Sequence, residues 1–319
     1  MENIDAETEK KLCEKYCINI KYNSIEELCE KRNIELIKDA ALSEYTTFAI
    51  GGKCDFLVKP DSFGSLRDVI LYCRENDVKY YVLGKGSNVL VSDNGLKGVV
   101  IVLSSPFSKI TESEDGIYCE AGASLTRLCT YAKDKELTGL EFAYGIPGTV
   151  GGALYMNAGA YGGEMKDVVV SCDYLDENLE IKTMYAEEMK LSYRHSIFCE
   201  KNYIILGVLF RLEKGDKAEI TAKMSELMDK RRSKQPLEYP SAGSTFKRPE
   251  GDFAGRLIEV SGLKGFSCGG AQVSEKHSGF VVNKGGATCE DVKNVISAVK
   301  EKVYKDSGVM LECEVLILE

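Results

Sequence analysis

The sequence contains no tryptophan, only two histidines and six prolines in 319 residues, and no long apolar run. A helix that crosses a membrane needs about 20 consecutive apolar residues. The first residues, MENIDAETEKKLCEKYC, are polar and acidic, whereas a secretory signal has an apolar core. We therefore expect a cytoplasmic protein without a membrane partner.

Metal-binding patterns are also missing. The twelve cysteines are scattered, none are spaced as CxxC, and the nearest pair is Cys13 and Cys17. With so few histidines, a zinc or iron–sulfur site has little support, so we expect no metal and reduced thiols. Five cysteines in apolar or alternating segments are expected to act as small hydrophobic residues: Cys119, Cys129, Cys172, Cys199 and Cys313.

The charge balance is acidic, with a formal net charge of -9. An acidic chain has no overall positive field to attract nucleic acid, so we expect no nucleic-acid partner. Any anionic ligand must be held by a local cluster of donors. The length predicts two or three domains, and 44% hydrophobic with 29% charged residues is typical of globular proteins.

The hydrophobic periodicity predicts alternating strands and helices. The first forty residues carry two helical patterns, and in the second Ser24 and Glu27 form a capping-box pattern. Further helices are predicted at 65–78, 124–137, 216–236 and 290–304, and strands at 54–60, 79–84, 95–105, 116–123, 166–176, 180–186 and 203–215. The last stretch, 309–319, is predicted to be a strand because Leu311, Cys313, Val315 and Ile317 alternate with other residues.

Glycine is concentrated in two segments. GKGSNVLVSD, residues 84–93, follows a predicted strand and matches neither a Walker A loop nor the dinucleotide fingerprint. Its free backbone N–H groups could form an anion-binding nest, although an ordinary strand-exit loop remains open. GIPGTVGGALYMNAGAYGGE, residues 145–164, has seven glycines among small apolar residues. This composition favours a rigid loop packed against a large cofactor rather than a flexible linker.

A third segment, PSAGSTFKRP at 240–249, combines two prolines with small residues, hydroxyls and a basic pair. An ordinary surface turn accounts for the proline, glycine and serine content. A reactive serine held close to a bound ligand accounts for it as well, and the segment alone does not decide between them.

Eight motifs occur along the chain in the same order as in one protein family, and together they make the resemblance to that family specific. They are TTFAIGG (46–52), GKGSNVLVSD, the glycine-rich 145–164, YRHSIF (193–198), PSAGSTFKRP, AGRLIEVSGLKG (254–265), GGAQVSEKHSGFVVN (269–283) and LECEV (311–315). Over roughly residues 40–319, the chain resembles the UDP-N-acetylenolpyruvoylglucosamine reductase family. There is no room between Tyr193 and Gly207 for the inserted loop of one branch, so the chain resembles the shorter branch.

The resemblance implies an α+β fold. It consists of a two-part FAD-binding α/β region, of the p-cresol methylhydroxylase and vanillyl-alcohol oxidase type, and a C-terminal α+β substrate-binding domain. The expected parts are an N-terminal helical segment (1–40), FAD-binding subdomain 1 (41–105, joined by the C-terminal strand 309–319), FAD-binding subdomain 2 (106–213) and the substrate-binding domain (214–308).

The resemblance also implies an activity. In the family, NADPH reduces noncovalently bound FAD, and the flavin then passes a hydride to the enolpyruvyl double bond of a nucleotide-sugar substrate, which gives UDP-N-acetylmuramate for peptidoglycan. Three catalytic roles carry over. Arg194 would grip the enolpyruvyl carboxylate, Glu314 would stabilise the enolate, and Ser244 would donate the proton, with Lys247 as helper. A surface ion pair for Arg194 and a solvent-facing Glu314 are the alternatives.

The binding residues implied by the resemblance form two groups. The cofactor group is Thr47, Gly84, Lys85, Gly86, Ser87, Asn88, Leu90, Ile146, Pro147, Gly148, Thr149, Gly151, Gly152, Ala153, Asn157 and Gly159. The substrate group is Tyr161, Tyr193, Lys234, Lys247, Arg248 and His277. Arg248 replaces the asparagine usual in the family, which puts that contact in doubt, and a structural histidine is an alternative for His277.

Two other functions remain open on the sequence. An FAD-dependent oxidase on the same cofactor fold would account for both glycine-rich loops, but not for the Arg194, Ser244 and Glu314 motifs. A non-catalytic protein that binds flavin or a nucleotide sugar would leave those motifs without a role. A monomer is compatible with the sequence.

Overall fold

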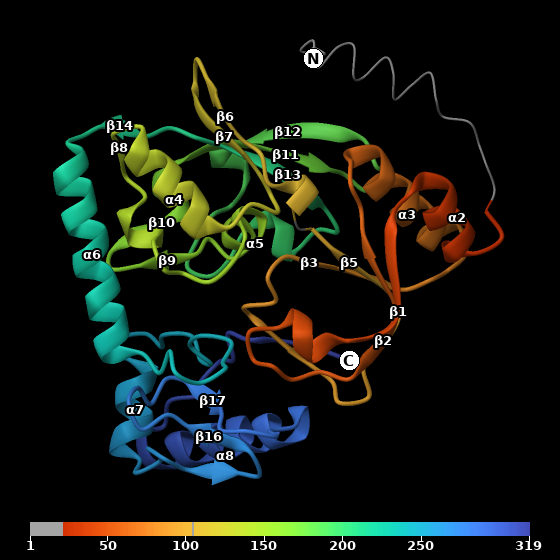
Figure 1. Ribbon diagram of the computed structural model, residues 1–319. Helices are drawn as coiled ribbons and strands as arrows, with labels where there is room; N and C mark the ends of the chain where they lie inside the picture. Colours follow the sequence, from red (N-terminus) through yellow and green to blue (C-terminus); the bar gives the residue numbers. More distant parts are fainter. Residues whose placement is uncertain (1–21, 104) are drawn as a thin grey trace.

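The computed structural model describes residues 22–103 and 105–319. The first of the two predicted N-terminal helical patterns lies outside these residues. The described chain is an α+β fold, with two mixed layers of helix and sheet in the upper part of Figure 1 and a smaller C-terminal part below them. Long helix α6 runs down one side and connects the two levels.

A four-stranded sheet has the strand order β1-β2-β5-β3. Its members are β1 (Glu35–Ala41), β2 (Lys53–Lys59), β5 (Leu96–Val102) and β3 (Tyr80–Leu83), with β1 antiparallel to β2 and both β2 and β3 parallel to β5. Helices α2 (Ile25–Arg32) and α3 (Phe63–Glu75) pack beside it, and their apolar residues join a common core.

The expectation that residues 1–40 are helical is wrong for residues 35–40, and the strand that they form continues to Ala41. This segment forms β1, because its backbone pairs with β2 from Glu35 opposite Lys59 to Ala41 opposite Lys53. The predicted start of α2 is confirmed, since the Ser24 hydroxyl accepts a hydrogen bond from the Glu27 amide. The carboxylate of Glu27 accepts from the amide of Asn23, one residue before the position that a capping box requires.

A five-stranded antiparallel sheet has the order β12-β11-β13-β7-β6. Its members are β12 (Ile181–Tyr185), β11 (Val169–Leu175), β13 (Ile204–Phe210), β7 (Gly116–Glu120) and β6 (Ile110–Ser113). Helices α4 (Leu125–Asp134) and α5 (Val150–Tyr155) accompany it, and α5 lies inside the glycine-rich segment that the sequence predicted only as a loop. Four of these strands were predicted, whereas β6 is too short and polar to give a periodic signal.

The C-terminal part begins with α6 (Lys217–Lys234) and contains α7 (Ala254–Val260) and α8 (Cys289–Ser307). Its small sheet consists of β15 (Ser267–Cys268), β16 (Ala271–Val273) and β17 (Val281–Asn283). Three further strand pairs are β8 (Leu137–Thr138) with β14 (Glu213–Lys214), β9 (Gly159–Ala160) with β10 (Gly163–Glu164), and β4 (Val89–Val91) with β18 (Leu316–Leu318). Single 3-10 turns lie at Leu42–Tyr45, Ser105–Phe107, Glu141–Ala143, Met165–Asp167, Ala186–Glu188 and Ile197–Cys199.

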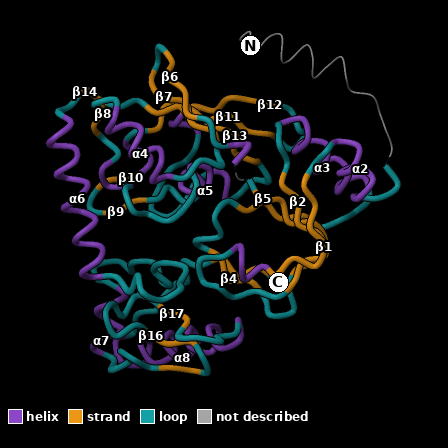
Figure 2. Tube along the Cα trace, in the orientation of Figure 1, coloured by secondary structure: helices purple, strands orange, loops and turns teal. Residues whose placement is uncertain are grey.

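The alternation predicts one continuous strand at 309–319, but the structure has no continuous strand there. Cys313 forms an isolated bridge with Phe246, and only the last residues form β18, which pairs in parallel with β4. Ile317, expected to be buried, is 40% exposed. The stretch therefore crosses from the C-terminal part to the loop after β3, and the end of the chain lies beside β4 in Figure 2.

The motif at 46–52 joins the two levels of the molecule. Phe48 and Ile50 are buried in the apolar cluster of the C-terminal part. Thr47 and Ser241 pair through their backbones, and the Thr47 hydroxyl also donates to the Ser241 carbonyl. The side chain of Asn283 donates to the carbonyl of Phe48. These contacts fix the 240–249 segment against the upper part of the molecule.

Three further findings limit the chemistry of the described residues. No helix among them is long and apolar enough to cross a membrane. Within residues 22–103 and 105–319, no group of three or more histidine, cysteine, aspartate or glutamate side chains is placed to hold a metal ion. Cys119, Cys129 and Cys172 are buried as predicted, whereas Cys199 is exposed because it ends a surface 3-10 turn.

Candidate active site

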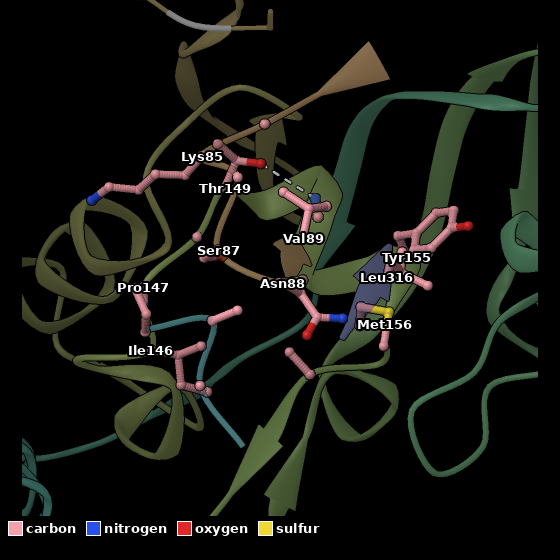
Figure 3. A pocket seen from close by; sticks show the side chains of 18 of the residues that line it. Lys85, Ser87, Asn88, Val89, Ile146, Pro147, Thr149, Tyr155, Met156 and Leu316 are labelled. Atoms are coloured by element: carbon pink, nitrogen blue, oxygen red, sulfur yellow. Dashed lines mark hydrogen bonds between the residues drawn. The ribbon is translucent and has the colours of Figure 1, made fainter. Parts of the chain in front are cut away.

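A cavity of about 490 Å³ lies where the upper part meets the C-terminal part, and Figure 3 shows its lining. Its walls come from the loop after β3, the loop before α5, the 241–244 segment and the chain end from Glu314. This volume is in the range of small-molecule sites. Four segments that are distant in the sequence therefore meet at one place.

Glycines let two of these walls approach each other. A Cβ atom on Gly84 would collide with the Thr149 hydroxyl, which belongs to the loop before α5. Gly86 has a φ of +60° in the left-handed region, and a Cβ atom there would collide with the carbonyl oxygen of Tyr45. The loop after β3 can take this path only with glycine at these positions.

The cavity brings together most of the predicted cofactor residues. Those that line it are Gly84, Lys85, Gly86, Ser87, Asn88, Ile146, Pro147, Gly148, Thr149, Gly151, Gly152, Ala153 and Gly159. The polar groups are few, and most of the lining surface is apolar. A lining of this kind fits a large planar cofactor with a polar tail, so these residues could hold FAD.

Three predicted cofactor residues do not line the cavity. Thr47 hydrogen-bonds to Ser241, and Leu90 is fully buried in the apolar cluster of the C-terminal part. Asn157 is also fully buried, and its amide donates to the Glu164 carboxylate at 2.9 Å and to the carbonyl of Ser192 at 2.9 Å. Their side chains stabilise the protein around the cavity.

Asn88 contacts the predicted catalytic segment directly. Its side-chain amide donates to the carbonyl of Glu314 at 3.1 Å, and its own carbonyl accepts from the amide of Leu316. The loop after β3 therefore fixes the backbone at Glu314. The sequence assigned Asn88 to the cofactor, and this positioning contact was not predicted.

The three predicted catalytic residues, Ser244, Arg194 and Glu314, all line the cavity. Ser244 is held by an isolated bridge to Phe280, and its neighbour Thr245 accepts a hydrogen bond from the Glu314 amide at 2.8 Å. The Ser244 and Glu314 backbones are thereby adjacent. Among the described residues, the Ser244 hydroxyl makes no hydrogen bond, which leaves it available to a ligand.

Arg194 and Glu314 form a largely buried ion pair. The Arg194 Nε donates to Oε1 of Glu314 at 2.6 Å, and Nη2 donates to the carbonyl of Gly159 at 3.1 Å. These two contacts leave the Nη1 edge of the guanidinium unused by the described residues. Arg194 also has a φ of +53°, which is uncommon for a residue other than glycine.

Burial raises the pKa of Glu314 above its usual value. The positive charges of Arg194 and Lys247 lower it, but they do not compensate for the loss of water around the carboxyl. The carboxyl therefore keeps its proton to a higher pH than an exposed glutamate does. An acid whose pKa is shifted by burial and by a specific charged partner, inside a cavity, is typical of functional sites.

The six predicted substrate residues lie outside the cavity lining. Tyr193 accepts a hydrogen bond from the backbone amide of Arg248, whose guanidinium stacks on the Phe253 ring at 4.5 Å. Lys247 lies 3.4 Å from the carboxylate of Glu312. The others are the exposed Tyr161 and Lys234, and His277, whose pKa burial lowers.

One charged cavity residue was not predicted. Arg231 of α6 is only 7% exposed and lines the cavity, whereas Lys234, which the sequence had favoured, is exposed. Arg231 continues the buried stripe of Ile220, Met224 and Leu227 along α6. That helical spacing was the signal that could have identified it.

Comparisons with known proteins agree with this geometry. A family model described as an FAD binding domain matches residues 54–184, and one described as the C-terminal domain of UDP-N-acetylenolpyruvoylglucosamine reductase matches residues 235–318. The predicted combination of an FAD-binding domain with this family's C-terminal domain is thus confirmed.

Proteins that are similar to this chain over most of their length carry the same enzyme name as the C-terminal family model. The chain is 49% identical over 284 residues to the UDP-N-acetylenolpyruvoylglucosamine reductase of Clostridium perfringens, covering 89% of this chain and 93% of that protein. It is 51% identical over 284 residues to that of Caldanaerobacter subterraneus, covering 89% and 94%. The crystal structure of the reductase from Thermus caldophilus has a TM-score of 0.77 and 35% identity, and the match covers 90% of this chain and 99% of that one.

Proposed function

The chain belongs to the UDP-N-acetylenolpyruvoylglucosamine reductase family, and from this premise we propose that it reduces UDP-N-acetylglucosamine enolpyruvate to UDP-N-acetylmuramate for peptidoglycan synthesis, with bound FAD and with NADPH as reductant. The observation that carries the proposal is the meeting of Ser244, Arg194 and Glu314 in a cavity between two glycine-rich loops. We place the reaction in the cytoplasm, where both NADPH and nucleotide sugars occur.

The glycine-rich loops would hold FAD without a covalent bond. The close approach of Gly84 to Thr149 and the left-handed turn at Gly86 let the backbones of the two loops run close together along the cavity. When bound, FAD supplies the hydride chemistry, and the protein contributes orientation and charge.

Arg194 would bind the enolpyruvyl carboxylate. Its Nη1 edge is unused among the described residues, and Glu314 and Gly159 hold the rest of the guanidinium in place. A planar guanidinium can donate two parallel hydrogen bonds to a carboxylate. Because Glu314 retains a proton to higher pH, its carboxyl can donate to an oxygen atom of the developing enolate.

Ser244 would deliver the proton to the substrate carbon. An unassisted hydroxyl is a weak acid, so a nearby positive charge must assist it. Lys247, three residues along, is close enough to Glu314 to lower the pKa of that carboxyl, and it would supply this charge. The order of roles is therefore carboxylate binding by Arg194, enolate stabilisation by Glu314 and protonation by Ser244.

The remaining substrate candidates would bind the nucleotide-sugar part outside the cavity. The contact between Tyr193 and the Arg248 backbone joins the two segments that carry Arg194 and Ser244. Arg248 and Lys234 are exposed cations in an acidic chain, which suits the diphosphate of such a substrate. Tyr161 and His277 are the further candidates for that part.

The test is a steady-state assay with purified protein loaded with FAD. NADPH should be oxidised at a rate that depends on added UDP-N-acetylglucosamine enolpyruvate, and UDP-N-acetylmuramate should accumulate in equal amount. Consumption of oxygen with an alcohol or amine substrate would instead show an oxidase. Binding of flavin without any NADPH oxidation would show a non-catalytic protein.

A further inference from the structure

Arg194 has a backbone conformation that an arginine does not favour. Ser192 and His195 exchange backbone hydrogen bonds at 3.1 Å, which closes a tight turn of two residues between them. Arg194 is the second of these two, and its φ of +53° lies in the left-handed region, where glycine is favoured. Such a conformation persists only when the surrounding structure holds it. The contacts that hold this turn therefore also determine where the guanidinium lies.

A fully buried amide contacts this turn. The Nδ2 atom of Asn157 donates to the carbonyl of Ser192 and to Oε2 of Glu164, both at 2.9 Å. Its Oδ1 accepts from the Lys166 amide at 2.9 Å, so the oxygen and both N–H groups of the side chain have partners. These three hydrogen bonds fix the amide in one orientation. Asn157 thus holds the carbonyl of Ser192, two residues before Arg194, in place.

Glu164 connects the same amide to a second contact of Arg194. In the β9–β10 hairpin, Glu164 lies opposite Gly159. A Cβ atom on Gly159 would lie 2.7 Å from Cγ of Glu164, so the two residues pack closely. The carbonyl of Gly159 accepts from Nη2 of Arg194 at 3.1 Å. One hydrogen-bond network therefore fixes both the backbone that carries Arg194 and an acceptor that its guanidinium uses.

We propose that Asn157 and Glu164 together position Arg194, so that its Nη1 edge faces the carboxylate of the substrate. The inference rests on the proposed function for the role of Arg194. Both residues lie outside the cavity lining, so they act on a ligand only through other groups. Their effect on the rate is large because a displacement of about 1 Å at a reacting group can slow a reaction about 10²-fold.

A contribution to FAD binding is the other role open to Asn157, since it belongs to the glycine-rich segment beside the cavity. If Asn157 acts through FAD, its loss weakens flavin binding and slows flavin reduction by NADPH. If it acts through Arg194, its loss slows only the reoxidation of the flavin by the enolpyruvyl substrate. Measuring the two half-reactions separately therefore distinguishes the two roles.

The test compares Asn157→Ala and Glu164→Ala with Asp176→Ala as matched control. Asp176 is only 3% exposed, and its carboxylate accepts from the amides of Asn178 and Glu180 in a turn outside the cavity lining. Its removal also breaks buried hydrogen bonds, so it should lower the melting temperature without affecting the site. FAD affinity is measured by fluorescence quenching, and both half-reactions by stopped-flow absorbance of the flavin.

In Asn157→Ala, reoxidation by the enolpyruvyl substrate should slow about 10- to 100-fold, whereas FAD affinity and reduction by NADPH should match the wild type. Glu164→Ala should slow reoxidation less, because the bond from Asn157 to Ser192 remains. Asp176→Ala should reoxidise at the wild-type rate. Each substitution is also made in Arg194→Lys, where Asn157→Ala and Glu164→Ala should cause no further loss, because the group that they position is gone.

Weaker FAD binding, or equal losses in both half-reactions of Asn157→Ala, would overturn the proposal in favour of the cofactor role. A further loss in the Arg194→Lys background would show that the effect does not pass through Arg194. If Asn157→Ala does not fold, Glu164→Ala decides, since that side chain is 25% exposed, and an unchanged reoxidation rate there would overturn the proposal. Wild-type protein whose reduced flavin is not reoxidised by the enolpyruvyl substrate would instead refute the proposed function.

Discussion

The Nε atom of Arg194 lies 2.6 Å from Oε1 of Glu314, although 120 residues separate them in the sequence. The backbone of Glu314 is held on both sides, since its amide donates to Thr245 and its carbonyl accepts from Asn88. The pair therefore links the loop between β12 and β13 to the chain end. Because the Glu314 carboxyl is buried despite this pairing, its protonation should affect both stability and activity.

The first prediction concerns pH and Glu314→Gln. The pKa of Glu314 is raised in the folded state, so between the unfolded value of about 4.5 and the raised one the folded state binds more protons. Stability then falls as pH rises through that window. The variant lacks this loss, so its melting temperature relative to wild type should increase as pH rises above 4.5. Thermal melts from pH 4.5 to 8 measure this.

Glu312→Gln is the control for that experiment, because Glu312 is on the same segment with its side chain 74% exposed. Its melting temperature should stay parallel to the wild type across the range. A parallel curve for Glu314→Gln as well would show that the buried carboxyl does not change protonation in this window.

Arg194→Lys should lose substrate reduction. An ammonium group cannot reproduce the two-pronged contact with a carboxylate or the separate hydrogen bonds to Glu314 and Gly159. We expect kcat/KM for the enolpyruvyl substrate to fall about 10²-fold or more, as for other lost transition-state donors. Arg211→Lys, at an exposed arginine outside the cavity, should behave like wild type. Near-normal turnover in Arg194→Lys would remove Arg194 from the site.

Ser244→Ala should separate the two half-reactions. Flavin reduction by NADPH does not need the hydroxyl, whereas reoxidation by the enolpyruvyl substrate needs its proton, so only the second rate should fall, by about 10²- to 10⁴-fold. Stopped-flow absorbance of the flavin measures both. Ser241→Ala, on the same segment, should reduce reoxidation far less. An equal loss in both half-reactions of Ser244→Ala would make Ser244 structural.

Gly86→Ala should impair cofactor binding through the backbone. The added Cβ would meet the Tyr45 carbonyl at a φ of +60°, so we expect a loss of about 1–3 kcal/mol in unfolding free energy and a lower flavin content. Gly64→Ala in α3 is the control, because the nearest atom to its Cβ lies 4.0 Å away. Full flavin content in Gly86→Ala would show that the left-handed turn is dispensable.

Local sequence patterns were sufficient to predict most of the helices and strands. Helices α3, α6 and α8 show apolar residues at helical spacing, and their buried faces follow that spacing. The length of the final strand was overestimated, because an alternating pattern indicates only which residues could face a core. Its pairing partner, β4, lies more than two hundred residues earlier, and that contact decides where the strand begins.

The candidate site was predictable where the backbone itself forms it. Glycines at 84 and 86 are required by close contacts, and a glycine-rich pattern reports such contacts directly. Side-chain roles were less accessible, because Thr47 and Asn157 are polar residues within recognisable motifs and yet bond to protein. Arg231 was missed since a basic helix end is also explained by the helix dipole.

The last prediction concerns Asn283, which joins the C-terminal part to the 46–52 motif. Its amide donates to the Phe48 carbonyl at 3.2 Å, and its oxygen accepts from the Gly285 and Ala287 amides. Asn283→Ala leaves these buried groups unsatisfied and should cost about 2 kcal/mol or more of unfolding free energy.

Asn283→Asp distinguishes the hydrogen bond that Asn283 donates from those that it accepts. A carboxylate still accepts from the Gly285 amide but cannot donate to the Phe48 carbonyl. If the Phe48 bond holds the two levels together, Asn283→Asp should speed hydrogen exchange at residues 46–50 while leaving exchange in α8 near the wild-type rate. Faster exchange in α8 alone would show that Asn283 stabilises only its own turn. Chemical denaturation and amide hydrogen exchange, run on both variants, distinguish these outcomes.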